Sequence, residues 1–373
     1  DFLERNGTLD NDQYGYRKRK GSNLSVMKIV QAIKEAWKEG QDVLALFIDL
    51  TKAFDTVWID GLLHKLKKAN VNGKFLAWVT NYLTNRTAQV LFQGRLSSNF
   101  QLVSGVPQGG VLSPILFLVY INDLEGQLPR DVWKSLFADD TAIFKTVSRD
   151  EAKAQKDIKS FTDAARGFET WAKHWRLQIS GPKSSTMLFR PSKARGNATV
   201  DKGFELNFAQ RDIKLTSTHN LTNEQLITRA NDIIRDKPLP STSELPSKLT
   251  STNQIEQLPK RHKSLIYTPT TRFLGMHLDP TLQLEGHIHK ILMKAKAKTK
   301  ILRALAHYRW GAQEKILTNF YNTWIRPTVE YCPEVLITLP HATLRALDQM
   351  QEEAARIIHQ LPRNTASMSA IVF

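Results

Sequence analysis

The chain has little of what disulfide-bonded, zinc-binding and membrane-spanning proteins need. It contains one cysteine, Cys332, among 373 residues. A single cysteine cannot form an intrachain disulfide or a cysteine-based zinc site, and this scarcity suits a reducing compartment. The longest apolar stretch, residues 111–121, is interrupted by Ser113 and Pro114 and is too short to span a bilayer. We therefore expect neither a disulfide framework nor a membrane partner.

Acidic residues are scarce relative to basic ones. Asp and Glu together number 36 against 52 Lys and Arg, which gives a formal net charge of +16 and a sequence pI of about 9.8. An excess of this size makes nucleic acid the default partner. A basic soluble protein without such a partner would scatter its charges over the surface. Clusters of cations are therefore better evidence for nucleic-acid binding than the net charge.

A pair of the few acids is placed where a metal site would need it. Residues 135–144 read SLFADDTAIF, which predicts a strand–turn–strand hairpin with Asp139 and Asp140 at its tip. Aspartate also favours ordinary turns, so the pair alone leaves that alternative open. Two adjacent carboxylates repel by a few kcal/mol at an effective dielectric of roughly 20, and a divalent cation would turn that cost into a binding site.

A third acid ends a different strand. Residues 43–58 read VLALFIDLTKAFDTVW, an apolar run that predicts a buried strand ending in Asp49. A two-metal phosphoryl-transfer site needs acids that converge from separate strands around cations about 3.5–4 Å apart. Asp49, Asp139 and Asp140 are the acids that this chain could bring together in that way, and carboxylate oxygens suit Mg²⁺.

Taken together, these stretches resemble the palm motifs of reverse transcriptases. FIDLTKAFD at 47–55 is similar to the first motif, SGVPQGGVLSPILF at 104–117 to the second and FADD at 137–140 to the third. Their order and residue sequences resemble the reverse transcriptases of non-LTR, LINE-type retrotransposons, closest to the jockey and I-like groups. Weaker similarities extend the match over most of the chain outside residues 191–270; they lie at 13–22, 175–189, 271–279 and 325–336.

The resemblance implies an α+β fold: a right-hand polymerase with an antiparallel palm sheet, partial fingers and a helical thumb. Residues 1–190 would form the partial fingers and palm, and 271–373 the end of the palm and the thumb. Residues 191–270 are rich in Ser, Thr, Asn and Lys, and five prolines between 238 and 269 break any long element, so they read as a polar flexible insertion. A nucleic-acid contact through residues 260–263 is an open alternative there.

The implied activity is RNA-directed DNA polymerisation on an RNA template, from a DNA primer and dNTPs, with two Mg²⁺ ions. By resemblance, Asp49 and Asp139 would bridge the ions, the Leu50 carbonyl would complete the nucleotide-side ion, and Asp140 would be a looser ligand. The implied location is intracellular, in the nucleus and a cytoplasmic ribonucleoprotein.

Four further residues match positions that contact the nucleotide. Phe54 occupies the place of the aromatic steric gate that excludes a 2′-hydroxyl, although a core phenylalanine is the alternative. Gln108 and Gly109 resemble the motif that touches the nucleotide and its paired template base. Lys183 matches a lysine near the leaving phosphates, a candidate general acid, but Ser180 stands where the family usually has Asn.

A second group of cations points to a nucleic-acid backbone. A helix is predicted after residue 279, and it places Lys290, Lys294 and Lys298 one turn apart. No acid occurs between Lys290 and Arg303, so this line of cations could follow a row of phosphates. A solvated charged face is the alternative.

Other patterns predict the remaining elements. The glycine-rich turn at 104–110 should lead to a helix over 114–128 with Ser113 as N-cap, and Ser148 with Glu151 fits a capping box for a long helix to residue 175. Further helices are predicted at 22–39, at 312–326, at 341–360, around Leu62 to Leu66 and around Phe75 to Tyr82. A hairpin is predicted over residues 87–103, and strands flank residues 181–183.

Alternatives to an active polymerase also follow from the sequence. The chain begins with Asp and without a signal peptide, so it is expected to be a piece of something longer. The basic finger residues that the family places ahead of residues 13–22 would precede residue 1, and the upstream endonuclease domain is absent from this sequence. A truncated fragment that binds RNA without polymerising is therefore the main alternative. The motif sequences disfavour an intron maturase and a telomerase, and no motif supports a nuclease.

Overall fold

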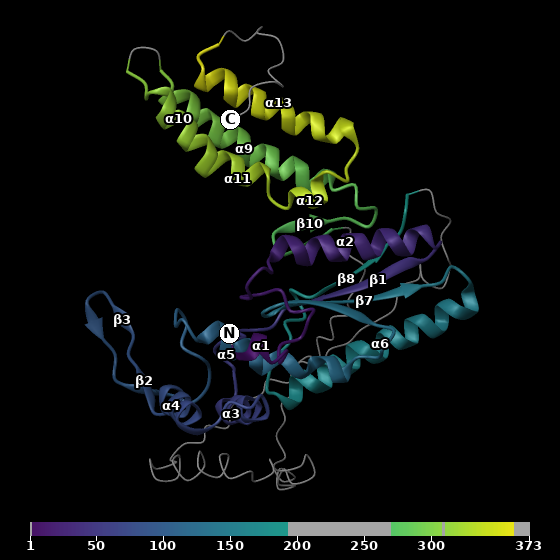
Figure 1. The fold of residues 1–373 in the computed structure, drawn as a ribbon, viewed down its shortest axis with the longest axis vertical. Coiled ribbons are helices and arrows are strands. Elements are labelled where there is room, and N and C mark those ends of the chain that lie inside the picture. The colour runs from purple at the N-terminus through teal and green to yellow at the C-terminus, as the bar shows by residue number, and fades with distance from the viewer. Residues whose placement is uncertain (1, 193–269, 308–309, 362–373) are drawn as a thin grey trace, which may run out of the picture. The chain divides into compact units, whose positions relative to one another are not determined.

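The computed structural model describes residues 2–192, 270–307 and 310–361, which form two compact units of mixed helix and sheet (Figure 1). The first comprises residues 2–18 and 44–186. The second comprises residues 19–43, 187–192 and the described residues from 270 onward. The predicted flexible insertion, including residues 260–263, lies almost wholly outside the described residues.

A four-stranded sheet organises the first unit. Its strands β1 (Asp42–Ile48), β6 (Trp133–Phe137), β7 (Asp140–Val147) and β8 (Ser185–Phe189) lie in the order β6-β7-β1-β8. Every residue of β1 is buried, which explains its uninterrupted apolar sequence. Because β1 and β7 are neighbours, Asp49 at the end of one strand and Asp139 at the start of the other are brought to adjacent strands. The strand predicted before residue 181 is reduced to a single bridge, Leu50 with Ile179.

Three helical segments of this unit confirm the predicted elements but correct their ends. Helix α5 (Ser113–Ile121) continues as the 3₁₀-helix η1 (Asn122–Gln127), so the turn tightens where an α-helix was expected. The N-cap of α5 is Leu112, because the Ser113 hydroxyl instead donates to the Pro107 carbonyl. Helix α6 (Glu151–His174) packs on β7 and is capped by Asp150, whose carboxylate accepts from Lys153 N at 3.1 Å. Ser148 is not the cap, since its hydroxyl accepts from Asp150 N.

Helices α3 (Ile59–Lys68) and α4 (Gly73–Leu83) lead into the predicted hairpin. The hairpin is confirmed as two short ribbons, β2 (Arg86–Ala88) with β5 (Phe100–Leu102) and β3 (Leu91–Phe92) with β4 (Arg95–Leu96). Helix α4 buries Leu76, Val79 and Leu83. The aromatic residues that predicted this helix do not form its buried face: Phe75 and Trp78 are about half exposed.

The second unit contains helix α2 (Ser22–Lys38), which packs on α12 (Pro333–Leu336), and a hairpin of β9 (Thr271–Phe273) and β10 (Met276–Leu278). Helices α9 (Glu285–Leu305) and α13 (His341–Ile358) pack against each other and confirm the predicted helices. The helix predicted at 312–326 is instead α10 (Glu314–Phe320), a π-helical turn η3 (Tyr321–Ile325) and α11 (Arg326–Val329). Among the described residues, no helix combines the length and apolarity that crossing a membrane would require.

Candidate active site

The turn that carries Asp139 is held from the N-terminal segment of the chain. Ala138 and Asp139 form a two-residue loop, and Ala138 has a φ of +52°. Asp140 is not at the tip as predicted, because it is the first residue of β7 and pairs with Phe137. Gln13, only 2% exposed, accepts through its side-chain Oε1 from Ala138 N at 3.0 Å and Gly15 N at 2.8 Å. This side chain fixes the backbone next to Asp139.

The end of β1 is held by residues 178–184. Asp49 N donates to Ser184 Oγ at 3.2 Å, and the Asp49 carbonyl accepts from Ser180 N at 2.8 Å. Thr51 N donates to the Gln178 carbonyl at 2.8 Å. Asp49 is thus positioned by the same segment that carries Lys183.

The charges of Asp49 and Lys183 both act on Asp139. Burial raises the pKa of Asp139 above the usual aspartate value; the charge of Asp49 raises it further, and a backbone hydrogen bond and the charge of Lys183 oppose the shift. Lys183 Nζ lies 3.6 Å from Asp49 Oδ2, and the lysine side chain is 72% exposed. The structure therefore brings together three of the predicted site residues, and two are carboxylates that repel each other.

The carboxylate pair fits a divalent cation, although the described residues contain no group of three or more His, Cys, Asp or Glu side chains arranged to hold one. Asp49 Oδ2 is buried and accepts no hydrogen bond from the described residues. Its lone pairs are therefore available to coordinate a cation. Asp49 and Asp139 are only partly buried, and Lys183 offsets some of their repulsion. A hard cation with carboxylate ligands would offset the rest.

Phe54 and the glycine-rich turn are joined to each other close to the loop that follows β1. The Phe54 ring stacks on Phe117 with centroids 4.7 Å apart and planes at 15°, and it remains only partly buried. The Phe54 carbonyl accepts from Val106 N at 2.8 Å, which joins the loop after β1 to the turn at 104–110. Gln108 Nε2 donates to Asp55 Oδ1 at 2.9 Å, so this predicted nucleotide contact is turned towards Asp55.

Two glycines of the turn differ in their surroundings. Gly105 has a φ of +86°, and a side-chain carbon there would lie 2.8 Å from the Asp55 carbonyl oxygen. Gly109 has a φ of +79° and nothing within 4 Å of such a carbon. Gly105 is needed for close packing within the protein, whereas Gly109 presents open backbone that another molecule can approach.

The predicted line of lysines on α9 is divided by the structure. Lys290 and Lys294 are exposed and line a cavity of about 300 Å³ together with Arg272 and His277. Lys298 does not share that surface, since its ammonium donates to the Trp324 carbonyl and to Thr328 Oγ1, each at 2.6 Å. Lys290 and Lys294 therefore face one cavity, although Lys290 Nζ also lies 3.2 Å from His277 Nδ1.

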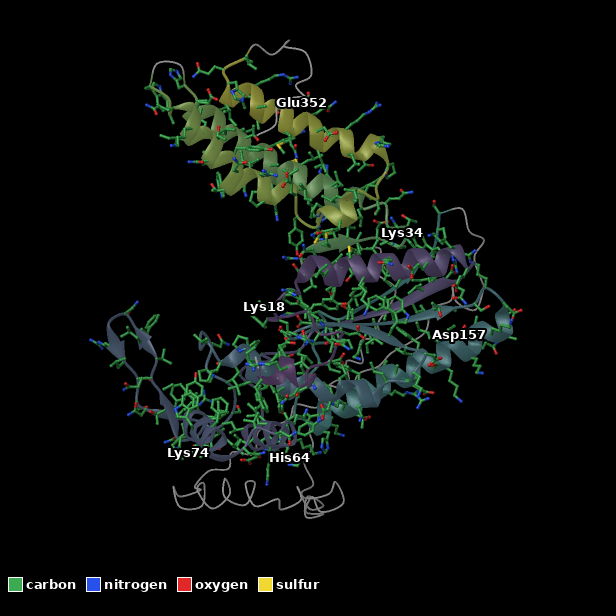
Figure 2. The ribbon with its side chains drawn as sticks, in the orientation of Figure 1. Lys18, Lys34, His64, Lys74, Asp157 and Glu352 are labelled. Carbon is green, nitrogen blue, oxygen red and sulfur yellow. The ribbon has the colours of Figure 1, made fainter. Side chains whose placement is uncertain are left out.

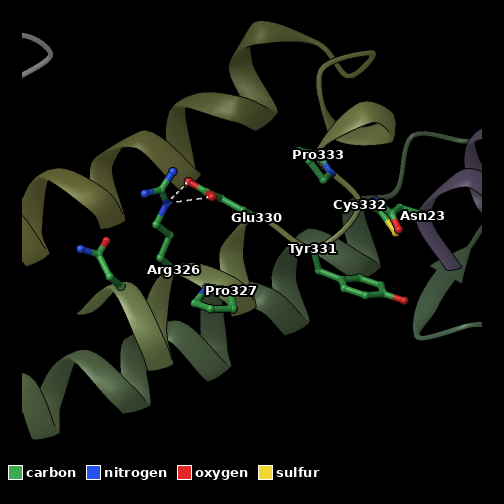
Figure 3. Close-up of a pocket in the computed structure, with 8 residues that line it drawn as sticks. Asn23, Arg326, Pro327, Glu330, Tyr331, Cys332 and Pro333 are labelled. Atoms are coloured by element: carbon green, nitrogen blue, oxygen red, sulfur yellow. Dashed lines mark hydrogen bonds and ion pairs between the residues drawn. The ribbon is translucent and has the colours of Figure 1, made fainter. Parts of the chain in front are cut away.

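A larger cavity, of about 420 Å³, lies in the second unit and is shown in Figure 3. Its lining includes Arg326, whose guanidinium Nε donates to both carboxylate oxygens of Glu330 at 2.9 Å. Cys332 also lines it, and burial raises the pKa of this thiol to about 11. The cavity contains none of the predicted site residues, and its opposite charges are paired with each other.

Sequence reasoning missed the residues that position the acids. Gln13 lies in a segment noticed only as a weak family similarity, and Ser184 in a stretch noticed for Lys183. Both act through contacts with residues 125 and 135 positions away. No local pattern encodes such contacts, so only the motif similarity at 13–22 and 175–189 could have indicated them.

Comparison with known proteins identifies the family of the chain. A family model described as reverse transcriptase (RNA-dependent DNA polymerase) matches residues 3–278. The RNA-directed DNA polymerase from mobile element jockey of Drosophila melanogaster is 30% identical over 233 residues, which is 60% of this chain and 25% of that protein. The probable RNA-directed DNA polymerase from transposon X-element of the same species is 30% identical over 191 residues, 50% of this chain and 20% of that protein.

Among solved structures, an apo telomerase from Candida tropicalis truncated from its C-terminal domain is 12% identical, with a TM-score of 0.39 over 56% of this chain and 41% of that one. A superposition this loose adds nothing to the assignment.

Two acids at the ends of neighbouring strands, a lysine beside them and a glycine-rich turn are features of a polymerase-type site. The chain belongs to the reverse transcriptase family, and its predicted resemblance to jockey-type non-LTR elements is confirmed. The family assignment supports the right-hand polymerase fold. The chain spans about a quarter of the length of the jockey protein.

Proposed function

We propose that this chain carries the polymerising centre of a non-LTR retrotransposon reverse transcriptase and copies RNA into DNA. The observation that carries the proposal is the placement of Asp49 and Asp139 at the ends of the adjacent strands β1 and β7, where the charge of Asp49 acts on Asp139. In this reading the four-stranded sheet is the palm, and the bundle of α9, α10, α11 and α13 is the thumb.

The proposed reaction is attack of a primer 3′-hydroxyl on the α-phosphate of a dNTP, with pyrophosphate as the leaving group. Asp49, Asp139 and the Leu50 carbonyl would hold two Mg²⁺ ions, with Asp140 as a looser ligand. Bound Mg²⁺ would supply charge neutralisation at the attacking and leaving oxygens. Catalysis of this kind depends mostly on positioning, and Gln13 and Ser184 keep the two carboxylates in place.

Three other residues would act on the nucleotide. The ring of Phe54, fixed against Phe117, would press on the sugar and exclude a 2′-hydroxyl. Gly109 offers backbone that the nucleotide and its template base can approach, and Gln108 would leave Asp55 to contact them. Lys183 Nζ would stabilise the leaving phosphates and donate a proton to them.

The nucleic-acid backbone would contact the second unit. Lys290 and Lys294 line one cavity with Arg272 and His277, a set with no carboxylate among its lining residues. Cations grouped in this way bind phosphates of either strand without reading the bases. Lys298 contributes to this surface only if its ammonium leaves Trp324 and Thr328.

The experiment is primer extension on poly(rA)–oligo(dT) with Mg²⁺. Asp139→Asn should lower extension by at least about two orders of magnitude, because it removes a charge that the reaction centre uses. The matched control is Asp163→Asn, an exposed aspartate on α6, which should extend like the unsubstituted chain. A thermal shift on adding Mg²⁺, present in the unsubstituted chain and lost in Asp139→Asn, checks the metal without activity. Substantial extension by Asp139→Asn would refute the assignment.

A second candidate function keeps the fold and omits the chemistry. Its support is the short coverage of the jockey protein together with the basic cavity on α9. If neither protein extends a primer but both bind RNA with strong salt dependence, the chain is an RNA-binding part whose polymerase activity needs further sequence.

A further inference from the structure

Helix α4 carries a row of aromatic rings that the proposed chemistry does not use, of which two are exposed and the third, Tyr82, is partly buried. Phe75, Trp78 and Tyr82, here called the aromatic row, lie three and four residues apart along one side of the helix. Phe75 and Trp78 have centroids 6.0 Å apart and planes at 17°, and Trp78 and Tyr82 have centroids 5.4 Å apart and planes at 7°. These are distances of offset stacking, in which part of each ring face stays uncovered.

The aromatic row is not needed to hold α4 in place. The helix already buries Leu76, Val79 and Leu83 on its other side, while Phe75 is 54% and Trp78 50% exposed. The hairpin that follows is also exposed, with Leu91, Phe92 and Leu96 each more than 60% accessible. Contiguous exposure of this kind marks a binding surface.

The charge of this region favours a polyanion as the occupant. Residues 61–122 contain four lysines and two arginines and no Asp or Glu, although Lys65 is buried and pairs with Asp123 just beyond this stretch. Lys74 (labelled in Figure 2) is exposed on α4 next to Phe75, and Arg95 is exposed on β4. Flat aromatic faces beside exposed cations are how proteins hold single-stranded nucleic acid, with bases on the rings and phosphates on the cations.

The position of the row relative to the glycine-rich turn indicates which strand it would hold. A side-chain carbon built on Gly110 would lie only 2.7 Å from the Tyr82 hydroxyl, so one end of the row touches this turn. The same turn contains Gln108 and Gly109, which are proposed to meet the template base. The other end of the row, at Phe75, leads away from the turn along α4.

We propose that the aromatic row is a stacking platform for the unpaired template strand ahead of the template base. The inference rests on the proposed function, since that function makes the ligand a template. Bases of the single strand would stack on the uncovered faces of Trp78 and Phe75, and Lys74 would contact the phosphate between them. Stacking of this type tolerates any sequence, which a copying enzyme requires.

The test measures binding rather than polymerisation and uses the whole chain. Fluorescence anisotropy would compare a primer–template duplex carrying a 5′ template overhang of about 10 nucleotides, within the site sizes of single-strand platforms, with a blunt duplex. The unsubstituted chain should bind the overhang duplex more tightly. Trp78→Ala should weaken overhang binding about tenfold, the effect of losing one stacked base, and leave blunt-duplex binding unchanged.

Three further variants sharpen the result. Trp78→Leu keeps apolar bulk without an aromatic face and should behave like Trp78→Ala, whereas Trp78→Phe should restore overhang binding. Trp310→Ala removes a tryptophan of similar exposure from the second unit and should change nothing. Circular dichroism would confirm that the variants are folded. If Trp78→Ala does not fold, Trp78→Leu takes its place as the variant without an aromatic ring.

Equal overhang binding by the unsubstituted chain, Trp78→Ala and Trp78→Leu would overturn the proposal. Unchanged RNA binding with altered self-association in size-exclusion chromatography would assign the row to a protein contact instead and would also overturn it. Because binding is read without dNTPs, loss of polymerase activity leaves this result interpretable, and an active enzyme with no overhang preference would refute only the platform.

Discussion

His287 is a buried histidine on α9 whose surroundings oppose its protonation. Burial lowers its pKa to about 4, and the charges of His277, Lys290 and Lys294 act in the same direction. Its Nδ1 accepts from His277 N at 3.3 Å, and its Nε2 is buried with no hydrogen-bond partner among the described residues. His289, two residues away on the helix, is exposed.

The consequence is a loss of stability in acid. In the unfolded chain His287 binds a proton near pH 6.5, but in the folded chain only near pH 4, so between these values the unfolded state takes up more protons. The free energy of unfolding therefore falls as the pH is lowered through this window, by at most about 3 kcal/mol. Thermal unfolding at pH 7.5 and pH 5 should differ less for His287→Gln than for the unsubstituted chain. His289→Gln is the control, and an equal pH dependence in all three proteins would contradict the prediction.

Phe54 is held where a steric gate would need a rigid ring. Its partner Phe117 is fully buried in α5, so stacking at 4.7 Å fixes the Phe54 ring plane. Phe54→Ala should raise ribonucleotide incorporation relative to deoxyribonucleotides at least about tenfold, because removing the ring opens space for a 2′-hydroxyl. Primer extension with rNTPs and dNTPs measures the ratio, and Phe54→Tyr, which keeps the ring, should preserve selectivity. An unchanged ratio in Phe54→Ala would leave Phe54 as a core residue only.

At the scale of elements, the glycine-rich turn offers a matched pair of substitutions. Gly105 and Gly109 both have positive φ, so alanine at either position costs about 1–2 kcal/mol of backbone strain. At Gly105 the new carbon would also clash with the Asp55 carbonyl oxygen, which should add about 1–3 kcal/mol. Chemical denaturation should find Gly105→Ala clearly the less stable variant.

Primer extension should distinguish the same two variants differently from stability, because Gly109→Ala should be the variant whose activity loss exceeds its stability loss. Gly109→Ala should lower primer extension more than its small stability loss explains, since its carbon points into open space where the nucleotide is proposed to lie. Equal stability losses would mean that the contact between the turn and Asp55 relaxes easily. Full activity in Gly109→Ala would remove Gly109 from the nucleotide site.

The elements that sequence predicted well are those whose signal is local and strong. The uninterrupted apolar run gave β1, the two apolar runs around the aspartates gave β6 and β7, and long periodic segments gave α2, α9 and α13. The two predicted N-caps were wrong because each serine side chain had a second possible hydrogen-bond partner. Ser113 and Ser148 are good N-caps in isolation, but each binds a backbone group that tertiary or loop structure brings closer.

The aromatic spacing in α4 predicted a helix but not which of its faces is buried. Leu76, Val79 and Leu83 form the buried face, while Phe75 and Trp78 are about half exposed. Periodicity shows that a helix has two faces, but it does not say which face the tertiary structure covers. Asp49 and Asp139 could be singled out because their residue type and motif are distinctive, whereas no pattern marks Gln13 and Ser184, which hold the backbone beside them.

At the scale of the whole molecule, the excess of positive charge makes nucleic-acid binding depend on salt. Each phosphate contact contributes about 0.9 to the slope of log affinity against log salt for a duplex. Only those of the 52 basic residues that face the ligand contribute to this slope. Lys65, for example, is buried and paired with Asp123 at 2.6 Å, so its charge is already used within the protein.

Lys290, Lys294 and Lys298 of α9 test this distinction between cations exposed at the cavity and a cation that is hydrogen-bonded to neighbouring helical residues. Replacing Lys290 and Lys294 together by glutamine should lower the salt slope of duplex binding by about 1.8, two phosphate contacts, with little change in stability because both are exposed. Lys298→Gln should leave the slope unchanged and reduce the melting temperature, since its ammonium bonds to Trp324 and Thr328. Anisotropy titrations over a range of salt concentrations and a melting curve for each variant decide the matter. If Lys298→Gln instead lowers the slope by about 0.9, the same amount per lysine as the double variant, the Lys298 ammonium must leave Trp324 and Thr328 when nucleic acid binds. All three lysines then contact the nucleic-acid backbone.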